Sequence, residues 1–161
     1  MFDTELAVNN LLVRYAGRLT ADISDERMAE QPVPGVNHPA WILGHLTVTA
    51  EHGLSILGAI EQTTAGWGEL FGPGSKPTTT RQDYPGKDDL LKIFQSRYEQ
   101  LRQAAASASP EQLDQPSTNP LIREMLPTIQ EALAFLMTGH LGVHVGQLSA
   151  WRRMIGLPPM F

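Results

Sequence analysis

Two histidines four residues apart, His140 and His144, lie in the apolar C-terminal run LMTGHLGVHVGQLSAW. In a helix this spacing places both imidazoles on one face, one turn apart. Two nitrogen donors held in this way can bind a single cation at about 2.0–2.1 Å each. The apolar surroundings predict that this face points inward, where unpaired imidazoles are costly to bury. The pair therefore indicates a metal site, and ordinary core histidines bonded to polar neighbours are the alternative.

The other three histidines, His38, His45 and His52, repeat every seven residues, near one face of a second predicted helix. Successive members lie about 10.5 Å apart along the helix axis, so one cation can bind only one of them directly. His38 falls in the capping turn and is expected to face solvent. Spacing alone leaves both His45 and His52 open as the third ligand.

Four long helices must position these residues, because apolar side chains recur every three or four positions in four segments. No segment has the pattern of a strand. The expected spans are residues 3–22, 37–60, 87–108 and 129–155. With one wide crossover between the second and third helices, they predict an all-α four-helix bundle, a single domain over residues 1–161. Metal sites in such bundles lie between facing helices.

Capping residues mark several helix ends. Asn37 is the expected N-cap of the second helix, with Pro39 in its first turn. Thr128 and Glu131 form a capping box ahead of the last helix, and residues 109–112 resemble another ahead of a short extra turn.

The crossover, residues 61–86, is rich in glycine and proline and is expected to be irregular. Loops of this length in compact domains are often functional. The sequence leaves two interpretations open, a lid over a site and a surface loop.

Amino-acid composition limits the classes of protein to which this chain can belong. The chain has 161 residues, of which 42% are hydrophobic and 18% charged, as in a soluble globular domain. A net charge of -5 opposes binding to nucleic acid. Cysteine is absent, so no side-chain thiolate of the protein can ligate a metal or act as nucleophile. No apolar run suits a membrane span or a signal peptide, so we expect a cytoplasmic protein without membrane partners.

The segments NHPAWILGHLTVTAEHGL and HLGVHVGQLSAWRRMIGLPP, with the approach QPVPGVNHPAW, resemble the DinB/YfiT-like superfamily of metalloenzymes. That superfamily includes damage-inducible DinB proteins and bacillithiol or mycothiol S-transferases. The resemblance implies a four-helix bundle whose metal ligands are one histidine of the second helix and a His-x-x-x-His pair of the last. Carried over by motif, these are His45, His140 and His144. A divalent ion, nickel or zinc foremost, and a homodimer are also implied.

Three neutral imidazoles leave a divalent cation an open position, which is typical of catalytic sites. The chain has no His-Glu-x-x-His and no Glu-x-x-His motif, which argues against a zinc metalloprotease and a di-iron bundle. Glu51 lies about 120° from His45 around the helix and is a poor general base. Because a metal-bound thiol ionises readily, we favour transfer of a small thiol cofactor to an electrophilic small-molecule substrate. Metal-dependent hydrolysis and a non-catalytic, metal-binding stress-response bundle are the alternatives.

Other side chains receive supporting roles. Gln147 shares the histidine stripe and either orients a ligand or is a plain interhelical glutamine. Trp41 and Trp151 either wall the pocket or belong to the core. His52 is a candidate proton shuttle, or a histidine hydrogen-bonded at the bundle end. The arginines at 152–153 complement the dipole of the last helix.

Overall fold

A computed structural model describes residues 2–60, 63–118 and 123–160. Its long helices are α1 (Asp3–Thr20), α2 (Pro39–Ile56), α4 (Lys87–Ser107) and a last helix in three consecutive parts, α6 (Ile129–Ala134), η3 (Phe135–His140) and α7 (Leu141–Met154). The short elements are η1 (Asp25–Ala29), α3 (Trp67–Phe71), η2 (Arg81–Asp83) and α5 (Pro110–Leu113). No strand forms within these ranges, which confirms the predicted all-α bundle.

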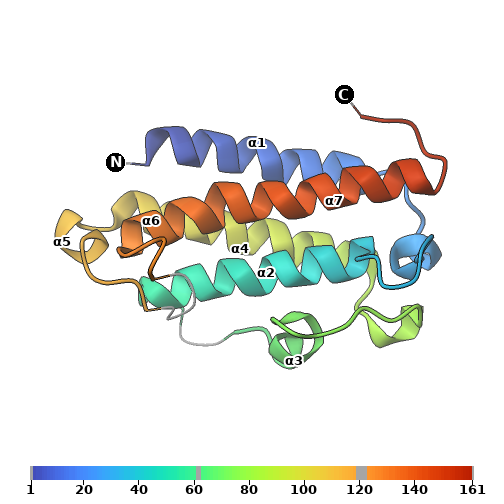
Figure 1. Cartoon of the computed structure of the whole chain (residues 1–161), viewed down its shortest axis with the longest axis horizontal. Helices are drawn as coiled ribbons and strands as arrows, with labels where there is room; N and C mark the ends of the chain where they lie inside the picture. Colours follow the sequence, from blue (N-terminus) through green and yellow to red (C-terminus); the bar gives the residue numbers. More distant parts are fainter. Residues whose placement is uncertain (1, 61–62, 119–122, 161) are drawn as a thin grey trace.

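The four long helices lie side by side, with α1 and the last helix running one way and α2 and α4 the other (Figure 1). The segment between the parallel helices α2 and α4 must therefore return along the length of the bundle. This is the predicted crossover, of which residues 61–62 lie outside the described part. It is less irregular than expected, because it contains α3 and η2 and buries Trp67, Phe71 and Tyr84.

The core draws fully buried side chains from every long helix. Examples are Leu19, Leu43, Phe94, Leu133 and Trp151. The Trp151 indole also donates a hydrogen bond to the carbonyl oxygen of Glu30, at 2.7 Å. Of the two interpretations of Trp151, the structure therefore supports the core.

Arg152 has a larger structural role than complementing the helix dipole. Its side chain is completely buried and donates to the Leu19 carbonyl oxygen at 2.7 Å. It also forms an ion pair with Asp22, and this hydrogen-bonded guanidinium lowers the pKa of the Asp22 carboxyl. These contacts tie the last helix to the end of α1. Arg153 instead donates to the Ser149 carbonyl oxygen near the helix end.

Of the three capping predictions, one is confirmed in full and one in part. Thr128 and Glu131 form the reciprocal capping box. Ser109 accepts from the backbone N–H of Gln112, but the Gln112 side chain donates to the Leu57 carbonyl oxygen and does not complete a box. The N-cap of α2, however, is His38 rather than Asn37. The prediction of the N-cap was therefore wrong by one residue. A ring nitrogen of His38, rather than the amide oxygen of Asn37, accepts the hydrogen bond from the first turn of the helix.

His38 is also completely buried, so the expectation that it faces solvent was wrong. Its Nδ1 accepts from the backbone N–H of Trp41, at 3.2 Å, and its Nε2 donates to the Thr78 carbonyl oxygen, at 2.9 Å. Tyr84 packs edge-on against the ring. The crossover thus covers a turn that local sequence would leave open to water.

Burial lowers the pKa of His38 from 6.5 to about 4. Because the unfolded chain takes up this proton first, the stabilisation is complete above about pH 6.5 and is lost progressively as the pH falls toward 4. We expect acidification from pH 7.5 to 4.5 to destabilise the wild type more than His38→Asn, by on the order of 2–3 kcal/mol. Urea unfolding at both pH values measures the difference. Asparagine can retain the N-cap, and the remaining histidines titrate in both proteins. Equal losses in both proteins would contradict the assignment.

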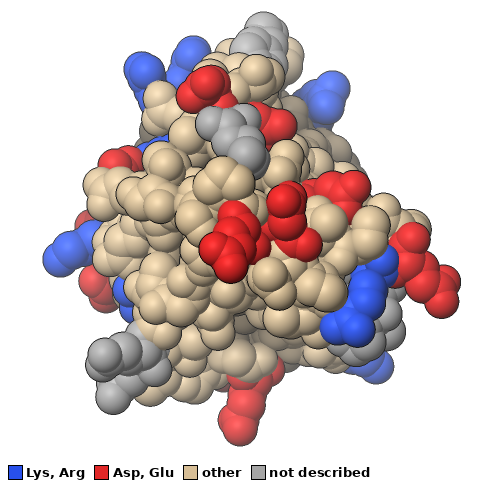
Figure 2. Space-filling model, turned by 90° about the vertical axis from the view of Figure 1, so that its left-hand side faces the viewer, with Lys and Arg blue, Asp and Glu red and all other residues tan. Residues whose placement is uncertain are grey.

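The left-hand end of the bundle carries acidic side chains near the middle of its face (Figure 2). Lysine and arginine side chains lie mainly toward the outline of this view. The pattern agrees with the net charge of -5. Within the ranges described, none of the helices has both the length and the apolar character that a membrane span requires.

Candidate metal centre

Three histidines from two helices converge inside the bundle. His45 comes from the middle of α2, His140 ends η3, and His144 lies in the first turns of α7. One nitrogen of each ring lies within 4.8 Å of the others, and the Nε2 atoms of His45 and His140 are 3.3 Å apart. The structure thus brings together the three residues that were predicted as ligands. His52 is not a member of this group and is exposed at the surface.

The separation of the His45 and His140 nitrogens suits a shared ion. Two ligands about 2.1 Å from a tetrahedral cation lie roughly 3.4 Å apart. The observed 3.3 Å between His45 and His140 is close to that value. His45 and His144 are 9% and 8% exposed, so this donor set is largely withdrawn from water. Its residue types and spacing fit a divalent metal ion.

Most of the chain matches the model of a known family. Residues 14–148 match the DinB superfamily, a range that contains all three histidines and parts of all four long helices. The chain belongs to the DinB superfamily. No curated protein matches it significantly. The match confirms the resemblance inferred from the two histidine-containing segments.

In this DinB-superfamily chain, backbone from the crossover orients the first histidine. His45 Nδ1 donates to the carbonyl oxygen of Phe71, at 2.7 Å. A carbonyl can only accept, so the proton resides on Nδ1 and the Nε2 lone pair faces the cluster. Gly44 makes this contact possible, because a Cβ there would lie 2.3 Å from Cδ1 of the Phe71 ring. Phe71 was missed by the sequence analysis, and no sequence pattern signals a backbone acceptor.

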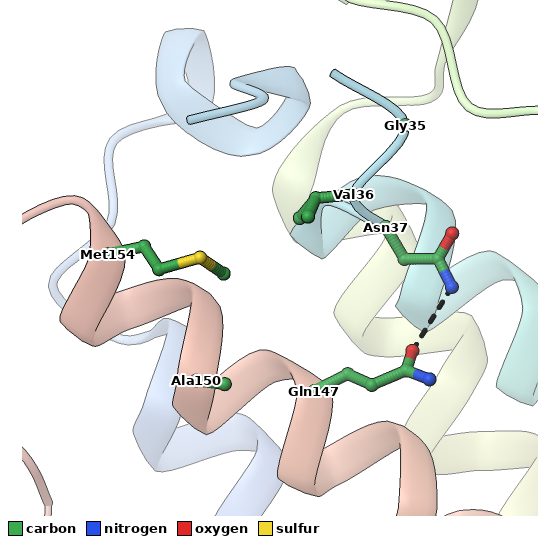
Figure 3. Close-up of a pocket in the computed structure, with 6 residues that line it drawn as sticks. All are labelled: Gly35, Val36, Asn37, Gln147, Ala150 and Met154. Carbon is green, nitrogen blue, oxygen red and sulfur yellow. Dashed lines mark hydrogen bonds between the residues drawn. The ribbon is translucent and has the colours of Figure 1, made fainter. Parts of the chain in front are cut away.

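A side-chain amide orients the last histidine. Gln147 Oε1 lies 3.1 Å from His144 Nδ1. The same oxygen accepts from Asn37 Nδ2, also at 3.1 Å, and Figure 3 shows this second contact. Donation from His144 Nδ1 to this oxygen leaves the Nε2 lone pair free for a metal. The orienting interpretation of Gln147 is therefore favoured over that of a plain glutamine. Asn37, expected as a helix cap, instead supports this amide.

We expect Gln147→Leu to weaken metal affinity by about 10–100-fold, because His144 would lose the acceptor that fixes its tautomer. Gln147→Glu keeps an oxygen acceptor for both neighbours and is the matched control. Competition for Zn²⁺ with a chromophoric chelator measures both variants. Equal affinity of Gln147→Leu and wild type would show that the amide does not orient the ligand.

His140 is the least satisfied member of the cluster. Its Nδ1 is buried and has no hydrogen-bond partner among the described residues. Buried polar atoms are nearly always paired, so an unpartnered ring nitrogen is uncommon. The fold alone leaves the burial of this imidazole poorly compensated, which fits a residue that binds an ion.

The cluster is held in the neutral form. Burial, and then the charges that His144 and His45 would carry, lower the pKa of His140 to about 4. Burial, followed by His45, lowers the pKa of His144 to about 4, although the hydrogen bond to Gln147 opposes this. Burial also lowers the pKa of His45. Because metals bind neutral imidazole, protons do not compete with an ion at neutral pH.

Trp41 walls one side of the cluster, as one interpretation of the sequence proposed. Its indole stacks on the His45 ring with centroids 4.7 Å apart and planes 7° from parallel. The indole nitrogen donates to Ser75 Oγ in the crossover, at 3.0 Å. The stacked ring keeps solvent from that face of His45.

The last helix contains a π turn that ends at the second ligand, His140. Residues Phe135–His140 form η3, and α7 continues from Leu141. A π turn carries an extra residue per turn and therefore shifts the faces of the preceding helix relative to those that follow. Such turns are frequent at functional sites. The apolar pattern of this run did not reveal it.

The carboxylate of Glu51 is bound by other residues, which agrees with the prediction that it is a poor general base. The carboxylate is 1% exposed and forms an ion pair with Arg97 Nε at 2.8 Å. It also accepts from the hydroxyl of Thr64, at 2.6 Å. No acidic residue belongs to the three-histidine group within the described chain.

Proposed function

We propose that this DinB-superfamily protein is a divalent-metal-dependent enzyme with His45, His140 and His144 as ligands. The observation that carries the proposal is the convergence of three neutral imidazoles beside a cavity. Nickel or zinc is the proposed ion, since imidazole suits both. Three protein ligands leave room for a further ligand, which a closed structural site would not.

We further propose that the reaction is transfer of a low-molecular-weight thiol to an electrophile. A divalent ion in the site would supply a lowered pKa for a thiol bound in the open position. The thiol loses its proton to water, and its sulfur forms a bond to the electrophilic carbon. The leaving group departs with the electron pair of the broken bond.

The chain's own residues favour a thiol over water as nucleophile. Activation of water commonly uses a carboxylate base beside the metal, as in the His-Glu-x-x-His enzymes. The nearby candidate, Glu51, is held by Arg97 and Thr64 instead. The residues that remain at the cluster orient and shield the histidines. Phe71 and Gln147 fix ring orientation, and Trp41 excludes water from one face.

Turnover assays with and without metal test the proposal. Protein loaded with Zn²⁺ or Ni²⁺ is incubated with an electrophile and, in turn, bacillithiol, mycothiol, glutathione and cysteine. We expect thiol consumption that a chelator abolishes and added metal restores, and none with His140→Ala. Metal-dependent consumption of the electrophile without thiol would establish a hydrolase instead. A metal-dependent rise in Tm without turnover of any kind would establish a non-catalytic bundle.

A further inference from the structure

A cavity of about 320 Å³ adjoins the histidine cluster between α2 and η3. The side chains that line it include His45, Thr49 and His52 from α2, and Phe135, Leu136 and His140 from η3. Two of the proposed metal ligands therefore form part of its wall. The cavity therefore borders the proposed metal centre.

The cavity extends along α2 rather than only around the cluster. Its two lining histidines on that helix are seven residues apart, which is about 10.5 Å along the axis. The last helix runs antiparallel to α2 (Figure 1). Going from His140 back to Leu136 along the last helix is therefore the same direction as going from His45 to His52 along α2. One end of the cavity thus holds the proposed ligands, and the other lies at His52.

The residues that line the cavity disfavour a charged ligand. Its middle is formed by apolar side chains such as Val48, Phe135 and Leu136, and no lysine, arginine, aspartate or glutamate lines it among the described residues. A charged group placed there would lose hydration without gaining a partner. The volume is ample for a ring with a short chain, since a cavity of about 150 Å³ already admits benzene.

We propose that this cavity binds the uncharged, apolar body of the electrophilic substrate, with its reacting end at His45 and His140 and its far end at His52. This inference rests on the proposed function and specifies the substrate class. Acyl chains and small aromatic electrophiles fit this class, whereas phosphorylated and carboxylated compounds do not.

Binding of fluorinated probes, followed by ¹⁹F NMR, tests the selection against charge. The probes are 4-fluorobenzyl alcohol, 4-fluorobenzoate and 4-fluorobenzylamine, which share one body and differ in charge. Chelator-treated full-length protein is used, so that no ion can bind the carboxylate. We expect the neutral alcohol to bind at least about tenfold more tightly than either charged probe.

Obstruction of the cavity tests the location. We expect Val48→Phe to weaken binding of the alcohol by at least about tenfold, because the larger ring fills space in a close-packed wall. Val8→Phe makes the same change on α1, where Val8 is 38% exposed, and should leave binding unchanged. If Val48→Phe does not fold, Leu136→Phe obstructs the cavity from the opposite wall.

Orientation is tested with 4-fluorobenzyl mercaptan. Zn²⁺ should strengthen its binding by at least about tenfold relative to the alcohol, because the sulfur then reaches the ion. Equal affinity for charged and neutral probes, or unchanged binding in both obstructed variants, would overturn the inference. Because the first two assays need neither metal nor turnover, their failure is distinct from failure of the proposed function.

Discussion

His140→Ala is expected to lower the affinity for Zn²⁺ or Ni²⁺ by more than about 100-fold, beyond the loss typical of outer residues that orient a ligand. His140 Nε2 lies 3.3 Å from His45 Nε2, and the ring centroids of His140 and His144 are 4.7 Å apart. Its removal leaves two donors from different helices, with water in place of the third. Competition with chelators of graded affinity measures the loss, and metal analysis of the purified variant gives a second readout.

His52→Ala is the matched control for this prediction. His52 follows the same face of α2 as His45 but is exposed and outside the cluster. Its removal should leave metal affinity unchanged. Retention of wild-type affinity by His140→Ala, or a comparable loss in His52→Ala, would rule out the proposed ligand set.

Gly44→Ala is expected to destabilise the protein by about 1–3 kcal/mol, the usual cost of overpacking a core. The added Cβ would lie 2.3 Å from the ring of Phe71, which is completely buried. Relief requires a shift of this buried ring, which belongs to the residue whose carbonyl oxygen accepts from His45 Nδ1. We therefore expect weaker metal binding together with lower stability. Urea unfolding and Zn²⁺ competition measure the two effects.

Gly146→Ala separates this packing effect from helix propensity. Gly146 also lies inside a long helix, but a Cβ there has no atom within 4 Å. Alanine should stabilise it by about 0.5–1 kcal/mol, as in exposed helix interiors. The two substitutions are identical in chemistry and opposite in expected sign. A stabilising Gly44→Ala would show that Phe71 moves aside freely and does not constrain His45.

Much of the scaffold and half of the site could be predicted from local sequence. Apolar periodicity located the four long helices, although α1 and α2 end at Thr20 and Ile56, before the expected ends. The sequence also predicted the pairing of His140 with His144 and the capping box at Thr128. Each depends on groups within one or two turns of the same helix, whose relative positions follow from sequence spacing.

Contacts between different helices could not be predicted from spacing along the sequence. Spacing left both His45 and His52 as candidates, and the family resemblance then selected His45. In the folded chain His45 faces the pair on the last helix, whereas His52 lies further along α2 at the far end of the cavity. Which turn of one helix faces which turn of another depends on how the helices are aligned along the bundle, and helical period carries no such information.

The crossover accounts for the remaining differences between the predictions from sequence and the structure. It buries His38, which local sequence placed in water, and supplies the Phe71 carbonyl that orients His45. Residues 61–86 carry no periodic pattern that specifies where they pack. Their position follows from the parallel course of α2 and α4, which forces the connection back along the bundle. The sequence thus specifies the donors along each helix, whereas packing between helices brings them to one point, because only that packing sets distances between residues far apart in the chain.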